Sequence, residues 1–224
     1  MAYKIVVFVL SSLLPRSLRL LVLSKCLGYE IHRSSHISRL CCVVPEHLHM
    51  AEGARIGAFT VALHLSSLSV GKFSSIGRSN WITGHSNHSL NHFSHVVGRN
   101  SSLVLGDHSA ITKGHLIDCT HQIRIGSFTT VAGYRSQFLT HGIDLETCRQ
   151  HCQPIEIGSY CLVGSGVIFL GGARLPSFSV VGAGSVVNKP HMNEHRLYAG
   201  APALERKVLS PDAAYFSRSS GFVS

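Results

Sequence analysis

The sequence predicts an all-β solenoid in which triangular coils of parallel strands stack along one axis. Three observations predict it. Apolar residues recur at every sixth position, compact residues stand at a fixed offset from them, and the pattern returns in several separate runs. A period of six matches neither a helix nor an ordinary strand. In the longest run the apolar positions are Ile157, Val163, Phe169, Leu175, Val181 and Val187.

The same period recurs earlier in the chain. The earlier runs are Val70, Ile76 and Ile82; Leu105, Ile111 and Ile117; and Ile125, Val131 and Gln137. We expect each hexad to form one short strand and a corner, and three hexads to form one coil. Neighbouring coils then stack about 4.8 Å apart, and the apolar side chains form an internal column. Glycine and compact residues such as Cys161 allow the tight corners.

Composition limits the functional classes. Of the 224 residues, 45% are hydrophobic and 14% are charged, which excludes a disordered chain. Twenty lysines and arginines against eleven acidic residues favour a polyanionic small molecule or a membrane surface as partner. The cations form no basic block with interleaved aromatic residues, so nucleic acid is not expected. Seven cysteines without a Cys-x-x-Cys pair predict reduced thiols in the cytoplasm.

Both ends of the chain are predicted to cap the solenoid. Residues 1–40 form an N-terminal segment with a helix from about Pro15 to Leu27, and residues 208–224 form a C-terminal tail. The apolar run Ile5–Leu14 lacks a small-x-small cleavage site and is too short to span a membrane. Two alternatives stay open for residues 4–27: packing on the main domain or on a neighbouring subunit, and peripheral contact with the inner face of the membrane.

The C-terminal third also resembles a known family. The segments "VVGAGSVVNK" (180–189) and "LYAGAPALERK" (197–207) resemble the hexapeptide-repeat acyltransferases, whose fold is a left-handed parallel β-helix. The resemblance covers roughly residues 50–207, within a predicted β-helix domain of residues 41–207. Residues 117–158 resemble the bacterial enzymes that O-acetylate sugars of polysaccharides. The resemblance implies a homotrimer that binds acetyl-CoA between neighbouring β-helices and transfers the acetyl group to a carbohydrate hydroxyl.

The resemblance also implies a histidine base. The family's base commonly lies in an excursion loop, and here the hexads stop at residues 141–154, with His141 at the entry. A single histidine can deprotonate an alcohol, and a thioester needs no further activation. His121 precedes His141 by 20 residues, and the runs that start at Leu105 and Ile125 are also 20 residues apart. The two histidines are therefore expected at equivalent places on adjacent coils. His121 is therefore a second candidate for the base.

Further candidates follow from the same comparison. His115 and Asp118 are included because a related branch orients its histidine with an aspartate. Arg135, Asp144 and His85 are candidates for binding sugar hydroxyls. By resemblance the CoA arm runs along Gly164, Ser165, Gly182 and Ala183, and the phosphates lie near Lys189, Arg206 and Lys207. Leu204 departs from the family, since relatives often carry a basic residue there.

The many histidines raise the question of a metal. His85, His88, His92 and His95 are spaced three, four and three residues apart, but glycine, serine and asparagine between them favour a polar loop. "CRQHC" (148–152) lacks a second pair of ligands. No two histidines lie five positions apart, as they do in the zinc carbonic anhydrases with this fold, so no metal is expected. Two alternatives to sugar O-acetylation remain: a non-catalytic assembly module and N-acetylation of an amino sugar.

Overall fold

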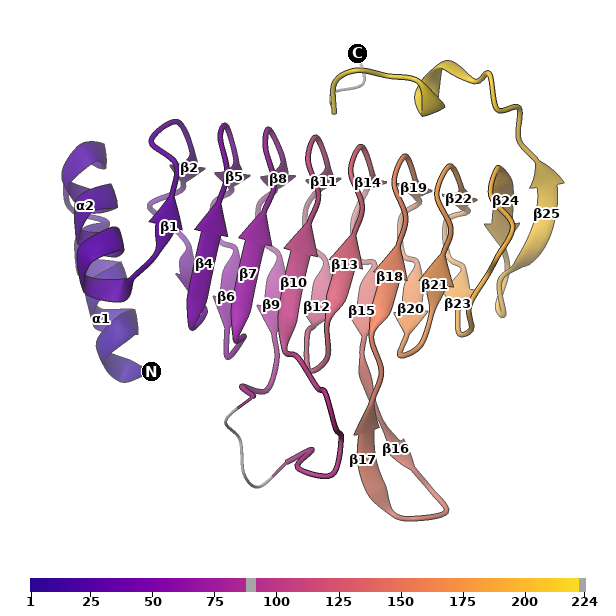
Figure 1. Cartoon of the computed structure of the whole chain (residues 1–224), viewed down its shortest axis with the longest axis horizontal. Helices are drawn as coiled ribbons and strands as arrows, with labels where there is room; N and C mark the ends of the chain where they lie inside the picture. Colours follow the sequence, from indigo (N-terminus) through magenta and orange to yellow (C-terminus); the bar gives the residue numbers. More distant parts are fainter. Residues whose placement is uncertain (88–91, 222–224) are drawn as a thin grey trace.

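The computed structural model describes residues 1–87 and 92–221, and it is a three-faced column of short strands with two helices at one end (Figure 1). The helices are α1 (Ala2–Ser11) and α2 (Arg16–Leu27), and a 3₁₀ turn spans Ala214–Phe216. The strands are β1 (Glu30–Ile31), β2 (His36–Ile37), β3 (Cys42–Val44), β4 (His47–Met50), β5 (Arg55–Ile56), β6 (Val61–Leu63), β7 (Ser67–Val70), β8 (Ser75–Ile76), β9 (Trp81–Thr83), β10 (Ser102–Leu105), β11 (Ala110–Ile111), β12 (Leu116–Asp118), β13 (Ile123–Ile125), β14 (Thr130–Val131), β15 (Gln137–Leu139), β16 (His141–Asp144), β17 (Arg149–Cys152), β18 (Ile155–Ile157), β19 (Leu162–Val163), β20 (Ile168–Leu170), β21 (Arg174–Leu175), β22 (Val180–Val181), β23 (Val186–Val187), β24 (Arg196–Ala199) and β25 (Leu204–Val208).

The strands form three sheets, which we call faces 1, 2 and 3. Face 1 has the order β1-β4-β7-β10-β13-β18-β21, face 2 the order β2-β5-β8-β11-β14-β19-β22-β24-β25, and face 3 the order β23-β20-β15-β12-β9-β6-β3. Neighbours within each face are parallel, except for the antiparallel pair β24–β25. Successive strands along the chain pass from face 1 to face 2 to face 3, so the predicted parallel β-solenoid is confirmed.

The apolar residue of each hexad points into the column. Ile157, Val163, Phe169, Leu175, Val181 and Val187 are all at most 2% exposed. Ile157 is in register with Ile125 on one side and Leu175 on the other, as the predicted stacking requires. The rings of Phe138 and Phe169 stack with centroids 5.1 Å apart. Each such side chain contributes about 1.5–3 kcal/mol of burial free energy.

One hexad differs from the predicted register. Gln137 was expected to point inward, but Phe138 is the buried residue and pairs with Ile117 below it. The corner between β14 and β15 is one residue longer than a hexad allows. Gly133 and Arg135 both take left-handed φ values there, 67° and 61°, whereas the equivalent corners of the two neighbouring coils have one such residue each, Gly114 and Gly166.

The helical segment covers the first coil. The helix predicted from Pro15 to Leu27 corresponds to α2, for which Pro15 is the N-cap, and Gly28 ends it in the left-handed conformation. The structure adds α1, which the sequence analysis did not predict. Arg19 of α2 is buried and donates to the carbonyl oxygen of Ile37 at 2.9 Å. The stack already begins at β1, within the segment 1–40 that was assigned to the N-terminal cap.

Two excursions leave the column from the edge where face 3 meets face 1 (Figure 1). One is the segment between β9 and β10. The other, predicted as the loop 141–154, is the antiparallel hairpin β16–β17, in which His141 pairs with Cys152. The C-terminal segment folds back along the edge between faces 1 and 2, where Tyr215 donates to the carbonyl oxygen of Cys161 at 2.9 Å.

Candidate functional site

A histidine and an aspartate meet at the base of the two excursions. Asp118 is the last residue of β12, and His141 is the first residue of the hairpin on the next coil. The Nδ1 atom of His141 lies 2.7 Å from Oδ2 of Asp118. The carboxylate is 12% exposed and the imidazole 44% exposed, so the pair has a buried side and an accessible side. This is the arrangement of a base held by an orienting carboxylate.

Several donors fix the carboxylate of Asp118. Its Oδ1 accepts hydrogen bonds from the backbone N–H and the hydroxyl of Thr120, at 3.1 and 2.6 Å. Its Oδ2 accepts from the backbone N–H of Thr140 at 3.0 Å. Burial by itself raises the pKa of Asp118, but the hydrogen bonds from Thr120, His141 and Thr140 and the charge of His141 outweigh burial and bring the pKa below its usual value. Asp118 is therefore ionised at neutral pH.

The ionised carboxylate determines the state of His141. Because a carboxylate only accepts hydrogen bonds, Nδ1 of His141 is assigned as the protonated nitrogen. In the neutral form of the ring, the other nitrogen, Nε2, carries the lone pair. None of the residues that the structure describes forms a hydrogen bond with Nε2. The ring can therefore accept a proton from a molecule beside it.

A cavity of about 250 Å³ lies beside this pair. Its wall combines the dyad with small, apolar and hydroxyl-bearing residues: Thr83, Gly84, His85, Leu116, Asp118, Thr120, Leu139 and His141. The volume is just below the range of sites that enclose a whole drug-sized ligand. A Cβ at Gly84 would lie 2.6 Å from the carbonyl oxygen of Cys119, so glycine is required for this close approach.

The first excursion packs against the dyad. The ring of Phe93 is 4% exposed and meets the ring of His141 edge-on at 6.2 Å. Arg99 donates to the carbonyl oxygens of Ser86 at 2.7 Å and Thr120 at 3.0 Å, which ties the excursion to the column. Burial, followed by the charges of His92, His141 and Arg99, lowers the pKa of His85. His85 is therefore neutral beside the dyad at neutral pH.

Sequence reasoning missed Phe93, Arg99 and the two threonines beside Asp118. The sequence held a signal for all of these except Arg99. Phe93 is an apolar residue inside a polar, histidine-rich segment, and the dipeptide Thr-His occurs at both 120–121 and 140–141. His88, in the same segment, lies outside the described residues.

The other candidate histidines lie elsewhere. The backbone N–H of His121 donates to Thr140 Oγ1 at 3.0 Å, but its ring turns back and accepts from the N–H of Gln122 at 2.7 Å. His121 does not line the cavity beside His141. His115 lies at the opposite edge of face 3, is 2% exposed, and accepts from the N–H of Ser136 at 3.2 Å. Burial lowers the pKa of His115 to about 4.

The candidate CoA residues do not lie together. Gly164, Ser165, Gly182 and Ala183 follow β19 and β22, and they form a strip where face 2 meets face 3. This strip is separated from the dyad by the width of face 3. The N–H groups of Gly164 and Gly182 already donate to the next coil, at 2.9 and 2.8 Å.

Three basic candidates lie toward the C-terminal end of the column. Lys189 is exposed and follows β23, on the same edge as the dyad. Arg206 and Lys207 lie on β25, and Nε of Arg206 donates to the carbonyl oxygen of Ala199 at 3.1 Å.

The candidates for sugar binding also lie apart from one another. Arg135 lies near the Gly164 strip, with its guanidinium 5.8 Å from the ring centroid of Tyr134. Asp144 closes the turn of the hairpin, where Oδ1 accepts from the N–H groups of Glu146 and Thr147 at 2.9 and 3.0 Å. His85 alone joins the dyad at one cavity.

The described residues contain no group of three or more histidine, cysteine or acidic side chains placed to hold a metal ion. Within them, no helix has the length and apolar content needed to span a bilayer.

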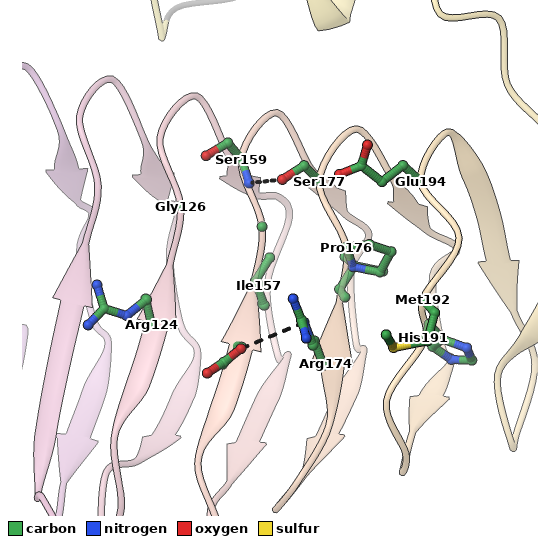
Figure 2. A pocket seen from close by; sticks show the side chains of 13 residues that line it. Arg124, Gly126, Ile157, Ser159, Arg174, Pro176, Ser177, His191, Met192 and Glu194 are labelled. Carbon is green, nitrogen blue, oxygen red and sulfur yellow. Dashed lines mark hydrogen bonds and ion pairs between the residues drawn. The ribbon is translucent and has the colours of Figure 1, made fainter.

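A second cavity, of about 370 Å³, lies on face 1 (Figure 2). Arg124 and Arg174 border it with Glu156, and Arg174 is 3.7 Å from Glu156. The labelled side chains come from β13, β18, β21 and the segment after β23, away from the edge that carries the dyad. Its charged groups offset one another, and the described lining residues include no histidine bonded to a carboxylate. The cavity beside His141 is therefore the better candidate site.

No protein-family model and no curated protein matches the chain. Solved structures do match. One is a Bacillus cereus protein assigned as an acetyltransferase, 19% identical, with 79% of this chain and 85% of that chain covered and a TM-score of 0.54. Another is a Vibrio cholerae hexapeptide-repeat acetyltransferase complexed with acetyl coenzyme A, 19% identical, with 93% and 88% covered and a TM-score of 0.48. A Clostridium difficile maltose O-acetyltransferase is 13% identical, with 93% and 86% covered and a TM-score of 0.41.

At 19% identity and a TM-score of 0.54, the Bacillus cereus structure shows similarity of fold alone. The chain is a left-handed parallel β-helix of hexapeptide repeats, as predicted, and its structural neighbours include acetyltransferases.

Proposed function

We propose that the protein transfers an acetyl group from acetyl-CoA to a hydroxyl of a sugar or polysaccharide precursor, with His141 as the base and Asp118 as the group that orients it. The observation that carries the proposal is the 2.7 Å contact between Nδ1 of His141 and Oδ2 of Asp118 beside a cavity. The resemblance of residues 117–158 to sugar O-acetyltransferases supports the choice of acceptor. The structural neighbours support the β-helix fold that would carry this chemistry.

The proposed reaction needs one proton carrier. Nε2 of His141 takes the proton of the acceptor hydroxyl while the oxygen attacks the thioester carbonyl carbon. Asp118 stabilises the imidazolium that forms. The tetrahedral intermediate then breaks its bond to sulfur, and His141 returns the proton to the leaving thiolate. The products are the acetyl ester and CoA.

The distance between the dyad and the strip at Gly164 favours a site shared between copies. Face 3, which separates them, carries exposed apolar side chains, including Trp81 at 52% and Leu116 at 41% exposure. Face 1 instead carries charged residues such as Arg124 and Glu156 at its surface. We propose that face 3 packs against neighbouring copies in a homotrimer. The strip of one chain then lies beside His141 of the next.

Coenzyme A would meet small residues and cations in this arrangement. The pantetheine arm would follow Ser165 and Ala183, and the phosphates would lie within reach of Lys189, Arg206 and Lys207. Acceptor binding is assigned to His85, the cavity wall and Phe93.

N-acetylation of an amino sugar is the second candidate, because the same base and thioester would acylate an amine. Hydroxylamine distinguishes the products, since it cleaves an acetyl ester but not an acetamide.

The test is CoA release from acetyl-CoA with a panel of sugar acceptors. We expect acceptor-dependent release by the wild type and a fall of roughly 10²- to 10⁴-fold in kcat for His141→Ala. His151→Ala, on the facing strand of the hairpin, is the matched control and should retain activity. No release above background with any acceptor would contradict the proposal. Equal activity of wild type and His141→Ala would assign the base elsewhere.

A further inference from the structure

Helix α1 leaves an apolar face uncovered at the end of the column. Its inner side packs on the first coil, where Phe8 is fully buried. On its outer side Tyr3, Val6, Val9 and Leu10 are each 51–65% exposed, and Leu13, in the turn after the helix, is 79% exposed. Positions 3, 6 and 10 follow the spacing of one helix face. In α2, Leu18 and Leu21 are also exposed, at 44% and 53%.

Such an arrangement needs an explanation, because water-exposed apolar surfaces of this kind usually mark an interaction site. The packing of the two helices on the column does not require these exposed apolar side chains. Phe8 and Leu23 hold the helices on the first coil, and Arg19 donates to the carbonyl oxygen of Ile37, so the outer side chains contribute little to these contacts.

The charges around this end indicate the kind of partner. Residues 1–45 contain six lysines and arginines and one acidic residue, Glu30, whereas residues 46–224 contain fourteen and ten. More than half of the net charge of +9 therefore lies in the first fifth of the chain. Lys25, Arg33 and Arg39 are exposed.

The structure shows the effect of this charge locally. Burial first, and then the charges of Arg16, Arg55 and Arg19, lower the pKa of His36 on the first coil. A positive potential of this kind attracts anionic lipid headgroups, while valine, leucine and an interfacial tyrosine enter the boundary of the acyl chains. A second copy placed on the same surface would bring two basic ends together, which is unfavourable.

We propose that the outer face of α1, together with the basic residues of α2 and the first coil, docks on an anionic lipid surface. The site is independent of the proposed chemistry, since it lies at the end of the column, away from the excursions (Figure 1). Docking would hold the protein at a membrane through the face of a helix that lies in the interface.

Co-sedimentation of the full-length protein with vesicles tests the proposal. One vesicle preparation contains phosphatidylcholine alone, and the other contains equal parts of phosphatidylcholine and phosphatidylglycerol. We expect binding to the anionic vesicles, weaker binding to the neutral ones, and a loss of binding when NaCl rises from about 0.1 M to about 1 M. Failure to bind the anionic vesicles at low salt would overturn the proposal.

Two variants assign the binding to this surface. Leu10→Asp with Leu13→Asp should reduce the affinity for anionic vesicles by roughly tenfold or more. Lys25→Gln with Arg33→Gln and Arg39→Gln leaves the apolar face intact and should also weaken binding. The matched control is Val97→Asp with Leu145→Asp, two apolar residues exposed on the excursions, at 96% and 88%. Unchanged binding by the leucine variant would overturn the proposal. A leucine variant that differs from wild type in oligomeric mass but not in vesicle binding would also overturn it.

Discussion

At the residue scale, the proposed function depends on how Asp118 holds His141. The two residues are 23 positions apart, and they meet because β12 and β15 are in register at an offset of 21. The aspartate also receives hydrogen bonds from Thr120 and Thr140, so its position is fixed independently of the histidine.

Asp118→Asn tests this orienting role. An amide can donate to Nδ1 and so favour the wrong tautomer of His141. We expect kcat to fall by roughly 10²-fold or more, while KM for acetyl-CoA stays near the wild-type value. Steady-state kinetics at saturating acceptor separates the two parameters. A rise in KM with unchanged kcat would instead assign Asp118 to substrate binding.

The buried imidazole of His115 predicts a pH dependence of stability. Its pKa is about 4 in the folded protein, against 6.5 in the unfolded chain, so between these values the unfolded chain binds the proton more tightly. The contribution of neutral His115 to the unfolding free energy is therefore present above pH 6.5 and is lost as pH falls toward 4. The loss amounts to about 3 kcal/mol. Urea unfolding of wild type and His115→Gln at several pH values measures it. Parallel pH profiles for the two proteins would contradict the assignment.

At the scale of elements, the hexads were predictable because each buried position has the same environment one coil away. Phe169 and Leu175, for example, could be assigned inward from spacing alone. The corner lengths could not be predicted, since a corner with two left-handed residues, such as Gly133 and Arg135, holds an extra position without changing the apolar pattern. For the same reason the offset of 20 between His121 and His141 did not place the two rings at equivalent sites.

The candidate site was predictable only in part. His141 could be chosen because the hexads stop beside it, and Asp118 because of the family resemblance. Their pairing, and the approach of Phe93 to His141, depend on the register of two coils and on the path of an excursion. Helix α1 was missed because its apolar residues extend around most of the helix and give no polar face.

The internal column predicts a large difference between two phenylalanines. Phe138 is fully buried and stacks on Phe169, whereas Phe73 is 55% exposed at an outer corner. Phe138→Ala should lower the unfolding free energy by about 3–5 kcal/mol. Phe73→Ala, the matched control, should cost much less because most of its ring is already in water. Chemical denaturation measures both, and equal losses would contradict the inward assignment of Phe138.

At the scale of the whole molecule, the proposed trimer places the functional groups of two chains together. Trp81 lies on the outer side of face 3 and outside the lining of the cavity beside His141. We expect wild type to sediment at three times the chain mass of 24.3 kDa, and Trp81→Lys to sediment as a single chain. Val208→Lys, an exposed position on the edge strand β25, is the control and should remain trimeric. Wild-type protein that sediments at the mass of one chain would contradict the proposed shared site.

In the proposed reaction, Nε2 of His141 takes the proton of the acceptor hydroxyl while the acetyl group passes to the acceptor oxygen. A crystal structure of the protein soaked with CoA tests this most directly. We expect the thiol to lie at the cavity beside His141, about 3–4 Å from where the acceptor oxygen must attack. We also expect the pantetheine arm to run along the strip at Gly164 of a neighbouring chain. A thiol seated in the cavity on face 1, or beside His121, would contradict it.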